Sequence, residues 1–212
     1  MIDRLTLLRV ALIADCLDAI GLRNQCLPAH IRPLEADSVV YGIAMPVTLR
    51  ETAPPDPASP HSYDGLISAI EALAKGDVLV ASSCPVSIWG ELLATASLAR
   101  GARGIVCDAY VRDAVDLREM GFPTFCAGCH PADMYGRGEV VAHGEPIEIA
   151  GVRIERGDLV AADRDGVVVV PAAAAAEVVE RAIAKGAGES TVRSELRAGE
   201  PIGEVFARHG IL

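Results

Sequence analysis

The most constraining feature of the sequence is an alternation of short apolar segments with helical segments between residues 78 and 126. Apolar stretches at 78–81, 104–107 and 123–126 have the length of buried strands. The segments between them, 89–100 and 113–120, have helical character and end at a glycine. This spacing predicts parallel strands joined by right-handed crossover helices. We therefore expect an α/β fold with a parallel βαβ core.

The segments outside this core predict further elements. Before it we expect a helix over 5–20, a strand over 38–49, a proline-rich loop over 51–62 and a helix over 66–75. After about residue 137, apolar residues alternate between turn signals, which predicts a β-meander. Residues 163–166 indicate a hairpin, because positions 161 and 172 are alanine where a calcium loop needs carboxylates. Helices are expected over 172–185 and 189–197.

Size and charge restrict the class of protein. The chain has 212 residues, of which 51% are hydrophobic, enough for one sizeable core, and we expect one domain over residues 1–212. A formal net charge of -10 argues against nucleic-acid partners and anionic membranes. Asp3, Arg9 and Asp15 interrupt the apolar N-terminal segment, which favours a helix over a signal peptide. We therefore expect a cytoplasmic protein without a membrane span.

The six cysteines do not indicate a disulfide framework in a chain of this size. Cys126, Cys129 and His130 match the C-x-x-C-H pattern of covalent haem attachment, but that chemistry requires export. A zinc site would need a second ligand pair at suitable spacing, and the sequence has none. We interpret Cys126 and Cys129 as packing residues at the end of a strand.

Polar residues gather where the strand over 104–107 ends. Asp108 follows it directly, and Arg112 and Asp113 lie within the same six residues, at the edge where open parallel sheets bind ligands. The preceding connection leads into a helix that opens at residues 90–93, whose free N–H groups would suit a carboxylate. The alternative is an ordinary surface loop, with Glu91 complementing the helix dipole and Arg112 and Asp113 solvated. Spacing alone leaves both interpretations open.

A family resemblance favours the site. The segments GDVLV, WGELLATASLARGARGIVCDAYVRD, GFPTF and GEPIEIAGVRIERGDLVAADRDGVVVVP resemble the RraA-like family, which contains 4-hydroxy-4-methyl-2-oxoglutarate aldolases and the regulator of ribonuclease activity A. The resemblance runs from about residue 14 to the C-terminus. It implies a swivelling βα sandwich assembled as trimers or hexamers, with active sites between subunits. The helical segment 172–212 would then pack on a neighbouring subunit.

The resemblance also assigns roles to residues. It implies that Asp113 directly holds a divalent metal, usually Mg²⁺ and alternatively Mn²⁺, and that Arg112 binds a 2-oxo acid. Glu91 would orient metal-bound water. The family's further water-holding ligand is a glutamate of the neighbouring subunit, matched here by Glu189, with Glu195 as the alternative. The backbone amides that would grip the substrate carboxylate belong to Gly90, Glu91, Leu92 and Leu93.

The sequence favours metal-assisted aldolase chemistry over two other strategies. A Schiff-base aldolase needs a buried lysine, but Lys75 and Lys185 both precede glycines at predicted helix C-termini. A zinc aldolase would want clustered histidines, and the five histidines are scattered. We expect a lyase that cleaves a 4-hydroxy-2-oxo acid, such as 4-hydroxy-4-methyl-2-oxoglutarate, to pyruvate and a second carbonyl compound, with oxaloacetate decarboxylation as a side activity.

Two other functions remain open at this stage. One is a non-catalytic protein that binds and inhibits ribonuclease E through its acidic surface. The other is a relative that holds a 2-oxo acid without turnover. The presence of Glu91, Arg112 and Asp113 favours the enzyme, because an inhibitor does not need these residues together.

Overall fold

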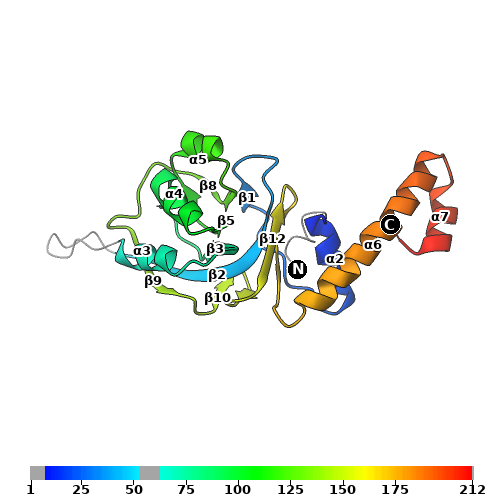
Figure 1. The fold of residues 1–212 in the computed structure, drawn as a ribbon, viewed down its shortest axis with the longest axis horizontal. Coiled ribbons are helices and arrows are strands. Elements are labelled where there is room, and N and C mark those ends of the chain that lie inside the picture. Colours follow the sequence, from blue (N-terminus) through cyan, green and yellow to red (C-terminus); the bar gives the residue numbers. More distant parts are fainter. Residues whose placement is uncertain (1–7, 53–62, 212) are drawn as a thin grey trace.

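The computed structural model describes residues 8–52 and 63–211 (Figure 1). Its helices are α2 (Val10–Ala19), α3 (Asp64–Glu71), α4 (Glu91–Ala99), α5 (Ala114–Met120), α6 (Ala175–Arg197) and α7 (Ile202–His209). Its first strands are β1 (Arg32–Pro33), β2 (Val40–Glu51), β3 (Asp77–Ala81), β4 (Ser87–Trp89), β5 (Gly104–Cys107), β6 (Tyr110–Val111), β7 (Thr124–Cys126) and β8 (Gly128–Cys129). The remaining strands are β9 (Gly138–His143), β10 (Ile147–Ile149), β11 (Val152–Ile154), β12 (Leu159–Asp163) and β13 (Gly166–Val170).

The main sheet has the order β1-β7-β5-β3-β2-β12-β13, and β9 also pairs with β2. The pairs β2–β3, β3–β5 and β5–β7 are parallel, which confirms the predicted parallel βαβ core and the α/β class. The two edges of the sheet approach each other, because Arg32 of β1 donates to the backbone oxygen of Asp165 in the β12–β13 turn at 2.9 Å. The sheet is therefore nearly closed.

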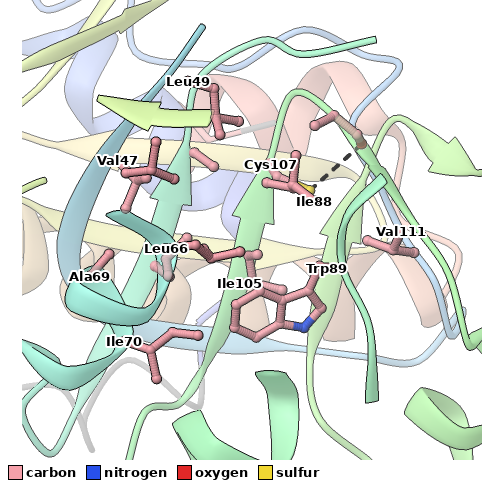
Figure 2. Close-up of a cluster of buried hydrophobic side chains, with 14 of the residues drawn as sticks. Val47, Leu49, Leu66, Ala69, Ile70, Ile88, Trp89, Ile105, Cys107 and Val111 are labelled. Carbon is pink, nitrogen blue, oxygen red and sulfur yellow. Dashed lines mark hydrogen bonds between the residues drawn. The ribbon is translucent and has the colours of Figure 1, made fainter. Parts of the chain in front are cut away.

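Alternation along the strands supplies three apolar clusters. In β3 the side chains of Val78 and Val80 enter the cluster enclosed by the sheet, while Leu79 and Ala81 face the cluster that includes residues of α3 and α4. Figure 2 shows part of that second cluster, which brings together residues of β2, α3, β4, β5 and β6. A third cluster joins α2 and α6 to β12 and β13. Figure 1 places α2 and α6 beyond β12, away from α3, α4 and α5.

A second, smaller sheet lies at the carboxyl ends of the parallel strands. Strands β4, β6 and β8 follow β3, β5 and β7 along the chain and pair in parallel in the order β4-β6-β8. Tyr110 and Val111, which we expected in a loop between Asp108 and Asp113, form strand β6 instead. The connections that lead to α4 and α5 are therefore held against each other by backbone hydrogen bonds before each helix begins.

The predicted β-meander is wrong in its connectivity, although its strands exist. Strand β2 has 12 residues, so β12 pairs with its first part and β9 with its second part. The β10–β11 hairpin comes between β9 and β12 along the chain and forms a separate two-stranded sheet. Its apolar residues fill the enclosed cluster instead of continuing the main sheet. The hairpin over 163–166 is confirmed.

The predicted helix ends were wrong at both termini of the chain. Helix α2 begins at Val10, and residues 5–7 of the predicted helix lie outside the described residues, as do 53–62 of the predicted loop. Helix α6 runs continuously through Gly186 and Gly188, where we expected a break. A Cβ at these two positions would lie 3.2 Å from Leu12 and 2.6 Å from Ile211, so the glycines permit close packing that outweighs their low helix propensity. Lys185 consequently lies within α6.

Beyond its first half, α6 and the following α7 extend away from the rest of the molecule, as Figure 1 shows. The two helices are joined by Arg208, which donates to Glu195 at 2.7 Å. Ile202 and Phe206 of α7 are 59% and 46% exposed. No helix within the described residues has the length and hydropathy that a bilayer crossing requires.

Candidate functional site

The small sheet brings the start of α4 beside the start of α5. Strand β4 ends at Trp89 and β6 ends at Val111, and these two residues are paired in the sheet. The amide of Arg112 donates to the carbonyl of Trp89 at 2.9 Å. Gly90 and Arg112, 22 positions apart in the sequence, therefore lie side by side as the two chains leave the sheet. This adjacency follows from parallel pairing, in which successive connections emerge at the same edge.

Asp113 has an unusual backbone and a defined side-chain contact. Its φ of 55° and ψ of 40° lie in the left-handed region, which Asp tolerates better than most residues. Its carboxylate Oδ2 accepts a hydrogen bond from the amide of Glu91 at 3.2 Å, at the first turn of α4. A Cβ on Gly90 would lie 2.4 Å from this oxygen. Position 90 must therefore be glycine for the Asp113 carboxylate to keep its present place.

A cavity of about 290 Å³ opens between these elements. Arg112, Asp113 and Asp133 are its charged lining residues. The other lining residues are Tyr63, Ser87, Ile88, Trp89, Gly90, Leu92, Leu93 and Met134. A small apolar cavity with a few convergent polar groups is the usual form of a ligand site. Of the residues that the sequence singled out, Gly90, Leu92, Leu93, Arg112 and Asp113 line it.

Three polar lining residues, Ser87, Tyr63 and Asp133, were not predicted, and two of them contact each other. Asp133 lies in the connection after β8, with its carboxylate Oδ2 3.6 Å from a guanidinium nitrogen of Arg112. The hydroxyl of Tyr63 donates to the same oxygen. Burial, and then this hydrogen bond, raise the pKa of Tyr63 to about 12, so its hydroxyl stays protonated at neutral pH. The position of Asp133 after a strand of the parallel series was the one signal that could have identified it.

The opening turn of α4 faces the cavity with part of its backbone. The first intrahelical bond joins the amide of Ala94 to the carbonyl of Gly90 at 3.1 Å, so the amides of Leu92 and Leu93 precede it. These two amides could bind a carboxylate. The amide of Glu91, which the resemblance also assigned to the substrate, already donates to Asp113. The Glu91 side chain accepts from Thr95 at 2.8 Å and is not among the lining residues.

Asp108 lies apart from the cavity lining. Its Oδ1 is 2.6 Å from Nε2 of His30, a partner from the segment before β1. The side chain of Asp108 is 17% exposed, whereas that of His30 is 56% exposed. This contact ties the end of β5 to the N-terminal part of the chain.

The C-x-x-C-H segment divides into a buried and an exposed part. Cys126 is buried and packs in the cluster with α3 and α4, as expected. Burial raises the pKa of its thiol to about 11. Cys129 and His130 are exposed, so the prediction that Cys129 is a packing residue is wrong. Cys129 is the last residue of β8, and the chain re-enters the core only at Met134, which is 1% exposed.

The predicted glutamates of α6 do not reach this cavity within one chain. Glu189 lies 3.5 Å from Arg193 on the same helix and lines a separate hollow between α2 and α6. Glu195 is bound by Arg208 and by His209, whose Nε2 lies 3.0 Å from its oxygens. These hydrogen bonds, that of His209 first, lower the pKa of Glu195. Figure 1 places α6 on the opposite side of β12 from α4.

The residues around Asp113 fit a hydrated hard cation. Among the described residues, no three His, Cys, Asp or Glu side chains come together as a closed metal cage. Mg²⁺ keeps several water ligands and needs only one or two carboxylates, which Asp113 at an open cavity can supply. Zinc would want nitrogen or sulfur ligands, and the lining residues include neither histidine nor cysteine.

Comparisons with known proteins agree with this arrangement. The RraA-like (Aldolase/RraA) family matches residues 10–169. The chain is 28% identical to the protein DlpA of Legionella pneumophila over 195 residues, which cover 90% of this chain and 30% of DlpA. It is 32% identical over 184 residues to a protein of Halalkalibacterium halodurans named "Putative 4-hydroxy-4-methyl-2-oxoglutarate aldolase", covering 84% of this chain and 79% of that protein.

A solved structure shares the fold. Streptomyces coelicolor RraAS2, described as an unusual member of the RNase ES inhibitor RraA protein family, superposes with a TM-score of 0.81 at 29% identity. The superposition covers 92% of this chain and 96% of RraAS2. With the family match extending over most of the described core, the chain belongs to the RraA-like family of aldolases and RraA proteins.

Proposed function

We propose that the protein is a metal-dependent aldolase that cleaves a 4-hydroxy-2-oxo acid to pyruvate and a second carbonyl compound. The observation that carries the proposal is the convergence of Arg112, Asp113 and the start of α4 on one small cavity. An acidic residue for a hard cation, a guanidinium for an oxo acid and free helix amides are together the groups that such a reaction needs.

Asp113 would hold the cation, and Glu91, with Glu189 of a neighbouring subunit, would hold its water. When bound, Mg²⁺ would withdraw electrons from the 2-keto group of the substrate. The amides of Leu92 and Leu93 bind the substrate carboxylate in this proposal, and Arg112 lies beside the keto oxygen. Glu189 requires a homo-oligomer, in which the α6–α7 arm (residues 175–209) packs on another copy of the chain.

The chain's own residues then favour cleavage of the C3–C4 bond, because they stabilise the negative charge that develops on the substrate. Water oriented by Glu91 accepts the proton of the C4 hydroxyl, and the C3–C4 electron pair moves onto C3 as C4 becomes a carbonyl. The resulting enolate places its charge on the keto oxygen, next to the guanidinium of Arg112. The water that accepted the C4 hydroxyl proton then delivers a proton to C3, which gives pyruvate. Decarboxylation of oxaloacetate would pass through the same enolate.

The test is pyruvate release by the purified protein from a panel of 4-hydroxy-2-oxo acids and oxaloacetate, with Mg²⁺ present. We expect turnover that excess chelator abolishes and that added Mg²⁺ or Mn²⁺ restores. Full activity in excess chelator would contradict the metal-dependent mechanism. Absence of pyruvate from every member of the panel would favour a non-catalytic RraA-type protein instead.

A further inference from the structure

The cavity that we assign to the aldolase has an uneven distribution of charge. Among its described lining residues, Arg112 is the one cation, whereas Asp113 and Asp133 are both carboxylates. Arg137, four positions after Asp133, is not in the lining. Its guanidinium donates to the backbone oxygen of Asp133 at 3.1 Å. The cavity therefore offers one positive side chain to an anionic substrate.

Asp133 also limits what Arg112 can do. Its carboxylate lies 3.6 Å from the Arg112 guanidinium and partly neutralises the positive charge of that group. Tyr63 donates to the same carboxylate oxygen and holds it beside the cavity. The Asp133 side chain is 26% exposed, so solvent screens its charge only in part.

The rest of the cavity suits an uncharged group. Trp89, Met134 and Leu92 supply apolar wall, and their neighbours Ile88 and Leu93 extend it. The volume of about 290 Å³ accommodates a small 2-oxo acid with its C4 substituent. In the proposed reaction, Arg112 and a cation on Asp113 are both engaged by the 2-oxo acid unit, so a second carboxylate would meet Asp133 and no further cation of the described lining. Such placement of like charges disfavours a ligand strongly.

We infer that the substrate is a monocarboxylic 4-hydroxy-2-oxo acid with a small uncharged substituent at C4, and that Asp133 discriminates against dicarboxylic substrates. This inference rests on the proposed aldolase function and specifies its substrate class. Asp133 is thus a specificity-determining residue. The first carboxylate and the keto group occupy Arg112 and the α4 amides, and the C4 substituent lies between Trp89, Met134 and Tyr63.

The test compares two substrates that differ in one C4 substituent, a methyl group in one and a carboxylate in the other. Pyruvate release is measured from 4-hydroxy-4-methyl-2-oxopentanoate and from 4-hydroxy-4-methyl-2-oxoglutarate, which carries a carboxylate in place of one methyl group. We expect Asp133→Asn to raise the ratio of kcat/KM for the dicarboxylic over the monocarboxylic substrate roughly tenfold or more. Comparing ratios between variants cancels the different intrinsic reactivity of the two substrates.

Two further variants control for loss of structure. Asp116→Asn removes an exposed carboxylate of α5 outside the cavity and should leave the ratio unchanged. Tyr63→Phe removes the hydrogen bond to Asp133 but leaves the negative charge of the Asp133 carboxylate in place. The discrimination against the dicarboxylic substrate should therefore persist. An unchanged ratio in folded Asp133→Asn would overturn the inference.

A binding measurement separates this inference from the function on which it rests. Titration calorimetry with Mg²⁺ present compares 2-oxopentanoate with 2-oxoglutarate, which differ in the same way. We expect the wild-type protein to bind 2-oxopentanoate roughly tenfold more tightly or better. Equal or tighter binding of 2-oxoglutarate would overturn the specificity assignment and leave the aldolase proposal standing. Binding of neither acid, together with no pyruvate release, would overturn both.

Discussion

The cavity at the strand ends and the α6–α7 arm are built in opposite ways. Around the cavity, three connections are joined by the small β4-β6-β8 sheet, and Trp89 and Val111 are 1% and 0% exposed. In the arm, Phe206 is 46% exposed, and Arg208 joins the two helices at the surface. The described lining of the cavity comes from one chain, whereas the arm presents apolar side chains that the described residues leave exposed.

The largest effect should come from Asp113→Asn. An amide is a poor Mg²⁺ ligand, but it can still accept the hydrogen bond from the amide of Glu91. We expect kcat/KM for pyruvate release to fall by roughly a thousandfold or more, while the denaturant midpoint stays near that of the wild type. A variant with nearly normal turnover would show that the cavity is not the site of the chemistry.

Arg112→Ala should have the next largest effect. If Arg112 stabilises the developing enolate, kcat/KM falls by roughly a hundredfold while stability changes by about half a kcal/mol. Asp108→Asn, at the end of the same strand and bound to His30 at 2.6 Å, is the matched comparison. We expect it to lower the denaturant midpoint more than the activity. Small and equal kinetic losses in both variants would indicate a solvated surface loop.

Gly90→Ala tests the fit between the two connections. The backbone at Gly90 is extended, with a φ of -158°, so alanine brings no backbone strain. Its Cβ would, however, displace the Asp113 carboxylate, whose oxygen lies 2.4 Å from the Cβ position. We expect kcat/KM to fall by about tenfold or more with a nearly unchanged melting temperature. Wild-type kinetics in this variant would mean that the place of the Asp113 carboxylate is unimportant.

Phe206→Ser tests the arm. Because this side chain is exposed in one chain, its replacement should leave the secondary structure intact and weaken the proposed assembly by roughly tenfold in dissociation constant. Ala207→Ser, at the next exposed position of α7, is the control and should not alter assembly. Sedimentation velocity over a concentration series measures both. Identical sedimentation of all three proteins would contradict packing of the arm on another chain.

Cys129→Ser should have the smallest effect of all. Its side chain is exposed, so we expect unchanged activity, metal content and stability.

Cys126→Ser buries a hydroxyl where a thiol packs, and should cost about 1–2 kcal/mol of unfolding free energy without affecting kcat/KM. Covalent haem in the purified protein, or loss of bound zinc from either variant, would contradict these roles.

The sequence predicts the parallel core well because its strands are continuous apolar runs. The bounds of β5 coincide with the predicted 104–107, and the placement of Arg112 and Asp113 beyond that strand follows from parallel topology. The small sheet was missed because strands of two or three residues carry no periodicity. Tyr63 and Asp133 were missed because they are 70 positions apart and meet only through tertiary packing. The same packing keeps α6 continuous through Gly186.

The central claim, that this cavity stabilises a pyruvate enolate, is tested most directly by exchange of the methyl protons of pyruvate in D₂O. This measurement needs no knowledge of the C4 substituent, because pyruvate itself is the common product. With Mg²⁺, the wild-type protein should incorporate deuterium at C3. In folded Arg112→Ala and Asp113→Asn, the exchange rate should be lower by roughly a hundredfold or more. Exchange by the wild type no faster than buffer, or equally fast in both variants, would contradict the account.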